Sequence, residues 1–230
     1  MRRMFFDIET IPSMNPDEAL RLFEVERERN AALVKPHPVE KVQANADEAW
    51  RKTALDPAAG HIFCVVVDTG HDVLTFGGKH EHQGVLYPTN EGAMLRDFAA
   101  WARGVIPGKL IGHNSVGFDR PFLRARALVH NVKLPSWLIR PLKPWDAVSL
   151  DTMLMWTGGQ AGKTISLDRL CRALGLEGKG DGPDGSQVWD MVKAGKVDDV
   201  VAYCAADVQR TRACYERMAA ILDDTGGEDE

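Results

Sequence analysis

The feature that most constrains the fold is a short apolar segment near the start of the chain, at residues 4–8. Its aromatic content, and the Pro12 that follows it, favour a central β-strand that leaves the sheet at a loop. Residues two apart in a strand point to the same face, so Asp7 and Glu9 would present two carboxylates side by side. Like charges repel, and the pair is unfavourable unless a cation lies between them. On its own, an exposed strand end with incidental acids would show the same pattern.

Strand patterns occupy the first half of the chain, and helical patterns mostly follow. Further strands are predicted at residues 62–67, 73–76 and 109–112. A helix at residues 91–103, capped by Asn90, separates the last two of these. Later helices are predicted at residues 118–129, 164–174, 188–193 and 197–222. This order indicates an α/β fold in which helices flank a mixed central β-sheet.

Composition favours a single soluble domain. The chain has 230 residues, of which 44% are hydrophobic and 27% charged, enough for one substantial core. We predict one domain over residues 1–222, with a helical insertion at about residues 15–60 and an acidic, disordered tail at 223–230. No apolar stretch approaches the roughly 20 residues that span a bilayer, and a charge precedes any signal-type segment. A cytoplasmic protein without a membrane partner is expected.

Charge and cysteine content narrow the classes of function. The formal net charge is -5, so no basic excess indicates passive nucleic-acid binding. A nuclease remains compatible, because divalent metals in a carboxylate site can supply the positive charge that faces a phosphate. The cysteines lie in apolar or helical contexts without a Cys-x-x-Cys pair, which predicts buried free thiols. They are Cys64, Cys171, Cys204 and Cys214.

Two further acidic positions follow later in the chain. A polar turn comes after the strand at 109–112, and Asp119 then opens a helix that has Pro121 in its first turn. Asp119 could cap this helix, serve a site, or do both, and Asn114 could hold either a ligand or the turn. In the last helix, the i,i+4 spacing of Tyr203 and Asp207 places a phenol and a carboxylate on one face. Taken singly, a core tyrosine beside a partly exposed aspartate explains that pair.

Together, and in this order, the three clusters resemble the motifs of the DEDD 3′→5′ exonucleases of the RNase H-like fold. Ala202 stands where the histidine branch of that superfamily needs its histidine, so the resemblance is to the tyrosine branch. The chain looks closest to predicted bacterial and phage exonucleases related to the proofreading domain of family B DNA polymerases. The resemblance covers the first strand and residues 62 to about 215. It is carried by Phe6–Pro12, Gly112–Leu123, Asp151–Met153 and Asp184–Trp189.

The resemblance implies phosphodiester hydrolysis with two divalent metal ions, Mg²⁺ or Mn²⁺, at the 3′ end of DNA, with single-stranded ends favoured. Asp7 would bridge both metals, Glu9 and Asp207 would complete the nucleophile-side metal, and Asp119 would hold the leaving-group-side metal. Tyr203 would orient the attacking water. Nucleoside 5′-monophosphates would be released. Replication or repair proteins are the expected partners.

Substrate contacts are predicted less directly. The set comprises Thr10, Asn114, Phe118 and Lys179. Lys163 is an alternative phosphate donor, although a solvated loop lysine explains either residue. Phe122 and Trp189 could stack on bases, but a core role is favoured for Phe122. The sequence His80-Glu81-His82 lacks further ligands and is interpreted as a polar loop.

The segment at residues 15–60 is too long for an ordinary hairpin loop between the first two strands. It carries seven cations, which acidic neighbours partly offset, and it begins just after Glu9. We therefore hypothesise a substrate clamp, with a solvated helix of alternating charge as the equal alternative. The alternative functions for the whole chain are a ribonuclease or structure-specific nuclease of the same fold, and a catalytically silent nucleic-acid-binding module.

Overall fold

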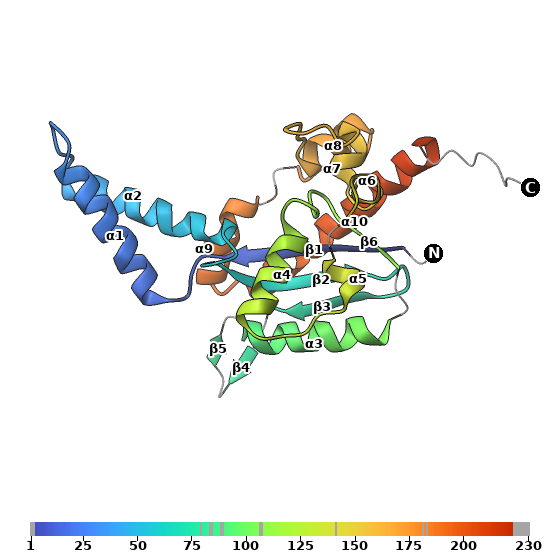
Figure 1. Cartoon of the computed structure of the whole chain (residues 1–230), viewed down its shortest axis with the longest axis horizontal. Helices are drawn as coiled ribbons and strands as arrows, with labels where there is room; N and C mark the ends of the chain where they lie inside the picture. Colours follow the sequence, from blue (N-terminus) through green and yellow to red (C-terminus); the bar gives the residue numbers. More distant parts are fainter. Residues whose placement is uncertain are drawn as a thin grey trace, which may run out of the picture.

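A four-stranded mixed sheet in the order β3-β2-β1-β6 forms the centre of the fold (Figure 1). Strand β1 (Arg3–Ile11) pairs antiparallel with β2 (His61–Asp68), which pairs antiparallel with β3 (Val73–Gly77). On its other side, β1 pairs in parallel with β6 (Lys109–Ile111). The computed structural model describes residues 3–78, 80–82, 85–87, 90–105, 108–140, 142–180, 182 and 184–222. The first apolar strand is central, as predicted, but it is longer than residues 4–8 and contains both acids.

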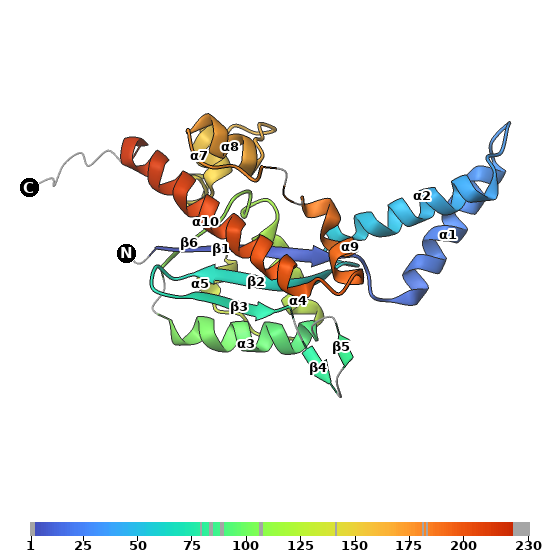
Figure 2. The same ribbon diagram turned by 180° about the vertical axis from the view of Figure 1, so that it is seen from behind.

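Helices cover both faces of the sheet, as Figures 1 and 2 show from opposite sides. Even positions of β1 pack against α3 (Glu91–Gly104) and α4 (Asp119–Val129). Odd positions face α9 (Val188–Lys193) and α10 (Val197–Leu222). The buried apolar residues of β1 are Met4, Phe6 and Ile8 on the first face, and Phe5 and Ile11 on the second. Because both faces are buried, the strand is apolar apart from Arg3 and Thr10 near its ends and the two acids Asp7 and Glu9.

The two longest predicted helices outside the insertion are confirmed. Helix α3 begins where the Asn90 side chain accepts a hydrogen bond from the Ala93 N–H at 3.1 Å. Helix α10 buries one face along its whole length. Neither α10 nor any other helix in the described ranges is both long and apolar enough to cross a membrane. The predicted acidic tail falls on residues 223–230, outside the described residues.

Short helices fill the region between α4 and α9. Helix α8 begins at Leu167, three residues later than predicted, because Ser166 caps it through the Arg169 N–H. Three others were not predicted, because each is too short to show helical periodicity. They are α5 (Ser136–Ile139), α6 (Pro144–Val148) and α7 (Thr152–Thr157). Helix α8 (Leu167–Ala173) packs on α10 through a small apolar cluster that contains Cys171 and Cys214.

The prediction of a polar loop at residues 80–82 is wrong. This segment is strand β4 (His80–His82), which pairs antiparallel with β5 (Val85–Tyr87) in a separate two-stranded sheet. A three-residue strand with alternating histidines has too little apolar periodicity to be recognised from sequence.

The segment between β1 and β2 forms a helical hairpin of α1 (Pro16–Ala31) and α2 (Val39–Lys52), followed by the 3-10 turn η1 (Thr53–Leu55). The hairpin projects away from the sheet beside α9 (Figures 1 and 2). Asn15 caps α1, and the prolines at 36 and 38 separate the two helices, as predicted. Helix α1 buries no residue, and α2 buries only Val42 and Ala46.

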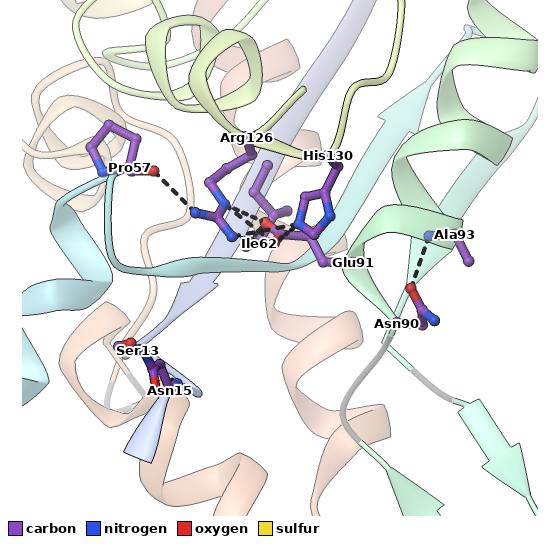
Figure 3. A network of polar contacts seen from close by, with 9 residues as sticks. All are labelled: Ser13, Asn15, Pro57, Ile62, Asn90, Glu91, Ala93, Arg126 and His130. Atoms are coloured by element: carbon purple, nitrogen blue, oxygen red, sulfur yellow. Dashed lines mark hydrogen bonds and ion pairs between the residues drawn. The ribbon is translucent and has the colours of Figure 1, made fainter. Parts of the chain in front are cut away.

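The end of this segment is tied to the sheet by a buried ionic network (Figure 3). Glu91, at the start of α3, accepts hydrogen bonds from the Ile62 N–H at 2.8 Å and from Arg126 at 2.7 Å, and its Oε2 lies 2.6 Å from His130 Nε2. Arg126 also donates to the Pro57 carbonyl at 3.2 Å. Burial alone would raise the pKa of Glu91, but these hydrogen bonds outweigh it and hold the pKa below its usual range.

Candidate active site

The site forms where β1 extends beyond its parallel neighbour. Strand β6 pairs only with residues 3–5 of β1, so this edge of β1 has no strand partner beyond Phe5 among the described residues. The Ile8 N–H on this edge donates instead to Asp119 Oδ1 at 3.2 Å. Asp119 is the first residue of α4 and is 3% exposed. This contact places its carboxylate beside Asp7, so Asp119 does more than begin a helix.

The opposite wall is α10, which crosses the sheet on the side of Asp7 and Glu9 (Figure 2). Cys204 donates from its thiol to Asp7 Oδ2 at 3.6 Å. Single ligand atoms of Asp7, Glu9 and Cys204 lie within 4.8 Å of one another. Asp207 lies one turn further along α10 than Tyr203, and its charge is close enough to raise the pKa of Asp7.

The electrostatics of this cluster call for a cation. Burial raises the pKa of Asp7 well above its usual value, and the charges of Asp119 and Asp207 raise it further. Burial and the charge of Asp7 do the same for Glu9, and burial raises the pKa of Asp119 to about 7. Burial also keeps the neighbouring Cys204 thiol protonated, since its pKa is raised well above the usual value. The available ligands are therefore oxygens, which suit Mg²⁺ or Mn²⁺ better than Zn²⁺.

Two basic side chains face Asp207. Lys179 Nζ donates to Asp207 Oδ2 and to Tyr203 Oη, both at 2.5 Å, and Arg210 donates to Asp207 Oδ1 at 3.0 Å. The main-chain N–H of Lys179 donates to Asp168 on α8, which fixes the loop that carries it. Burial and the neighbouring carboxylates raise the pKa of Tyr203 above its usual value, so the phenol stays protonated. Tyr203 can donate a hydrogen bond but cannot act as a general base.

A second carboxylate, Asp151, organises the loop that leads to Asp119. It is completely buried, and its two oxygens accept N–H bonds from Asn114, Val116, Met153 and Leu154. The loop also requires a left-handed backbone at Asn114, with φ 58°. Asn114 tolerates this conformation better than most residues, which supports the turn-forming interpretation of this residue.

His113 anchors the same loop to the neighbouring helices. One ring nitrogen lies 2.9 Å from Thr152 Oγ1, and the other lies 2.9 Å from the Ile165 carbonyl. Burial lowers its pKa, which favours the neutral ring. With both nitrogens engaged by protein groups, His113 holds the loop in place and is not available as a metal ligand.

The structure brings together most of the predicted site residues. Asp7, Glu9, Asp119, Tyr203 and Asp207 converge at one end of β1, and Lys179 joins them through its ammonium group.

The other candidates lie around this centre. Phe118 precedes Asp119 and packs against Phe122, which is only 1% exposed and belongs to the core. Thr10 and Trp189 line a pocket beyond Glu9, whereas Lys163 is exposed on the loop before α8.

Three contributors were not assigned site roles from sequence. Arg210 stands at i+3 from Asp207, a spacing that could have indicated the ion pair. Asp151 directly precedes a short helix, as capping residues do, but nothing local shows that it also binds the loop at residues 114–116. The contact between Cys204 and Asp7 joins residues far apart in the sequence and has no local signal.

Most of the chain is similar to known proteins. The family model described as "Predicted 3'-5' exonuclease related to the exonuclease domain of PolB" matches residues 62–229, well over half of the chain. The chain belongs to this family. An uncharacterized protein of Methanocaldococcus jannaschii is 30% identical over 125 residues, which make up 51% of this chain and 66% of that protein.

The family B DNA polymerase of the hyperthermophilic archaeon Pyrobaculum calidifontis has a similar fold, with a TM-score of 0.57 at 18% identity. The match covers 95% of this chain and 24% of the polymerase chain, so this chain spans about a quarter of the polymerase. At this identity the likeness shows the fold alone, the α/β RNase H-like fold predicted from the sequence. Residues 15–60, which contain the helical hairpin, lie outside the match to the family model.

Proposed function

We propose that this PolB-related family member is a metal-dependent 3′→5′ exonuclease of the tyrosine branch. It would hydrolyse the terminal phosphodiester bond of DNA, with single-stranded ends favoured, and release nucleoside 5′-monophosphates. The observation that carries this proposal is the convergence of Asp7, Glu9, Asp119 and Asp207 with Tyr203 at the open edge of β1.

Four carboxylates lie together at this place, and Glu9, Asp119 and Asp207 are buried there. Burial raises the pKa values of Asp7, Glu9 and Asp119, and the charges of neighbouring site carboxylates raise those of Asp7 and Glu9 further. These carboxylates and Asp207 would hold two divalent cations, Mg²⁺ or Mn²⁺. The cations would neutralise the negative charge of the scissile phosphate and lower the pKa of the attacking water.

The remaining chemistry belongs to side chains around the carboxylates. Tyr203 keeps its proton, so its role is to orient the attacking water by a hydrogen bond. The Lys179 ammonium reaches Tyr203 and Asp207 from a loop, and it can exchange these contacts for a phosphate oxygen of the substrate. Arg210 limits the movement of Asp207, because it binds the oxygen that Lys179 does not.

The direct test uses DNA oligonucleotides labelled at the 5′ end, single-stranded or duplex, and a matching RNA. With Mg²⁺ or Mn²⁺, single-stranded DNA should shorten in steps of one nucleotide, and a chelator should stop the reaction. Asp7→Asn should be inactive, whereas Asp97→Asn, on the exposed face of α3, should retain activity. Internal cuts would indicate an endonuclease, and preferential cleavage of RNA would indicate a ribonuclease. Binding without cleavage under all metal conditions would indicate a silent binding module.

A further inference from the structure

A pocket of about 430 Å³ lies at the base of the helical hairpin, beside the end of β1 that follows Glu9. Thr10, the residue after Glu9, forms part of its floor. One wall comes from the end of α2 and from η1, and the other comes from α9 and the preceding 3-10 turn η2 (Gly185–Gln187). We call this space the hairpin pocket. Its volume falls within the range of about 300–1,000 Å³ that is usual for small-molecule sites.

Contacts across the base hold the two walls of the hairpin pocket together. Arg51 on α2 forms two hydrogen bonds with Asp190 on α9, at 2.9 and 3.2 Å. Trp50 packs edge-on against Trp189, with ring centroids 5.3 Å apart. The pocket is therefore built jointly by the hairpin and by α9, and neither element alone could form it.

The lining of the hairpin pocket suits a planar, mainly apolar group with polar edges. Leu55, a large apolar residue that lines the pocket, is 67% exposed. The Trp189 ring also lines the pocket, and its buried indole N–H has no hydrogen-bond partner among the described residues. A nucleobase offers a flat π-face to side chains of this kind.

The charges of the hairpin argue against a grip on the phosphate backbone. Its arginines at 21 and 29 pair with Glu18 and Glu26 on the same helix, and Lys52 pairs with Glu48. Arg51 pairs with Asp47 as well as with Asp190. These pairs leave less free positive charge than the sequence suggests. The hairpin would then contribute through apolar contact, with little added salt dependence.

We propose that the hairpin pocket binds a nucleobase of the substrate strand, at or next to the 3′-terminal nucleotide. This inference rests on the proposed nuclease function, and it gives the insertion a role in substrate binding. The pocket adjoins Glu9 through Thr10, so a strand whose scissile phosphate lies at the carboxylates would place a neighbouring base within its reach.

The decisive variant is Leu55→Asp, which puts a negative charge at the rim where a nucleotide would enter. Leu55 is mostly exposed, so the change should leave the melting temperature almost unaltered. Leu20→Asp is the matched control, because Leu20 is 59% exposed on α1 of the same hairpin and outside the pocket. Leu55→Met tests whether any apolar side chain at this position is enough for oligonucleotide binding.

Affinity would be measured by fluorescence anisotropy with a 5′-labelled single-stranded DNA in Ca²⁺, and turnover in Mg²⁺. Leu55→Asp should raise both Kd and KM at least tenfold and change kcat less, whereas Leu20→Asp and Leu55→Met should bind as the wild type does. Equal binding by Leu55→Asp and wild type, or no oligonucleotide binding at all, would overturn the proposal. If binding depends on Leu55 but no hydrolysis is seen, the pocket proposal is supported and only the proposed nuclease function is refuted.

A second measurement needs no turnover. In ¹⁵N-labelled protein the Trp189 indole N–H signal can be assigned by its absence in Trp189→Phe. Titration with thymidine 5′-monophosphate should shift this signal in the wild type and shift it far less in Leu55→Asp. A response confined to other tryptophan signals would place the nucleotide elsewhere and refute the hairpin pocket as its site.

Discussion

Replacement of Asp151 should damage both the stability of the protein and the candidate active site, because Asp151 holds the loop that leads to Asp119. Its Oδ1 accepts N–H bonds from Asn114, Met153 and Leu154, and its Oδ2 accepts one from Val116. In Asp151→Ala the α7 cap is lost, which costs about 1 kcal/mol. Two partly buried loop donors, the N–H groups of Asn114 and Val116, are also left without an acceptor, at about 1–3 kcal/mol each. The expected loss of unfolding free energy is therefore about 3–7 kcal/mol.

Asp151→Asn separates the two oxygens. Its single amide oxygen can keep the three donors of Oδ1, but its NH₂ group must then face the Val116 N–H. One bond of the four is lost, so the cost should be about 1–3 kcal/mol, clearly less than for alanine. Because the loop leads to Asp119, kcat/KM should fall in both variants in the same order.

Urea unfolding followed by circular dichroism measures these differences, with Asp97→Asn as the exposed control. Activity would be compared at temperatures where each variant is folded. A loss below about 1 kcal/mol for Asp151→Ala would refute the assigned role, since it is no more than the α7 cap alone is worth. An asparagine variant as unstable as the alanine variant would show that the two oxygens do not act separately.

Two further predictions concern charge, and a third concerns the hydroxyl group of Tyr203. Glu91→Gln should lower the free energy of unfolding by about 3–5 kcal/mol at neutral pH, because it leaves Arg126 buried without its charged partner. The pKa of Glu91 is lowered in the folded state, so the stability that its charge contributes is lost as the pH falls below about 4.5. The difference in unfolding free energy between wild type and variant, measured in urea titrations, should therefore narrow at acidic pH. Asp7→Asn removes one of the mutually repelling carboxylates. In the metal-free protein at alkaline pH it should raise the melting temperature by about 2–4 °C for each kcal/mol of repulsion removed. Mg²⁺ should raise the melting temperature of the wild type but not that of this variant. Tyr203→Phe should reduce kcat by about 10²-fold or less in oligonucleotide assays, whereas Asp7→Asn should abolish it.

The central strand and the long helices were predictable because their signals are local. The apolar positions of α3 recur with helical spacing, and Asn90 precedes them as a cap. The convergence of the acidic motifs could be inferred only from their order along the chain, since no local pattern brings Asp119 to Ile8. That contact depends on β6 being shorter than β1, which the sequence does not reveal.

Tertiary packing determined what the sequence left open. A lysine in a glycine-rich loop has the pattern of a solvated side chain, yet the contact of the Lys179 N–H with Asp168 directs it into the site. The two-stranded sheet of β4 and β5 depends on backbone pairing between three-residue strands, which carry almost no periodicity. Most cations of the insertion looked available for phosphate, but several are neutralised by acids three or four residues away or, for Arg51, also by Asp190.

The ends of the insertion are held together independently of its length. Ile11 faces His61 at the last step of the β1–β2 ladder, and the Ser13 N–H bonds to Thr53 Oγ1 at 2.8 Å. These contacts close the base of the insertion, which we call the stem. Because the stem is closed, the register of the β1–β2 ladder does not depend on the residues that the insertion contains beyond it. The tip near Val34, which is fully exposed, is accordingly a natural position for circular permutation or for grafting a guest domain. During evolution, the tip of the hairpin is therefore free to diverge from the sheet, whereas its base is tied to α9 through Arg51 and Trp50.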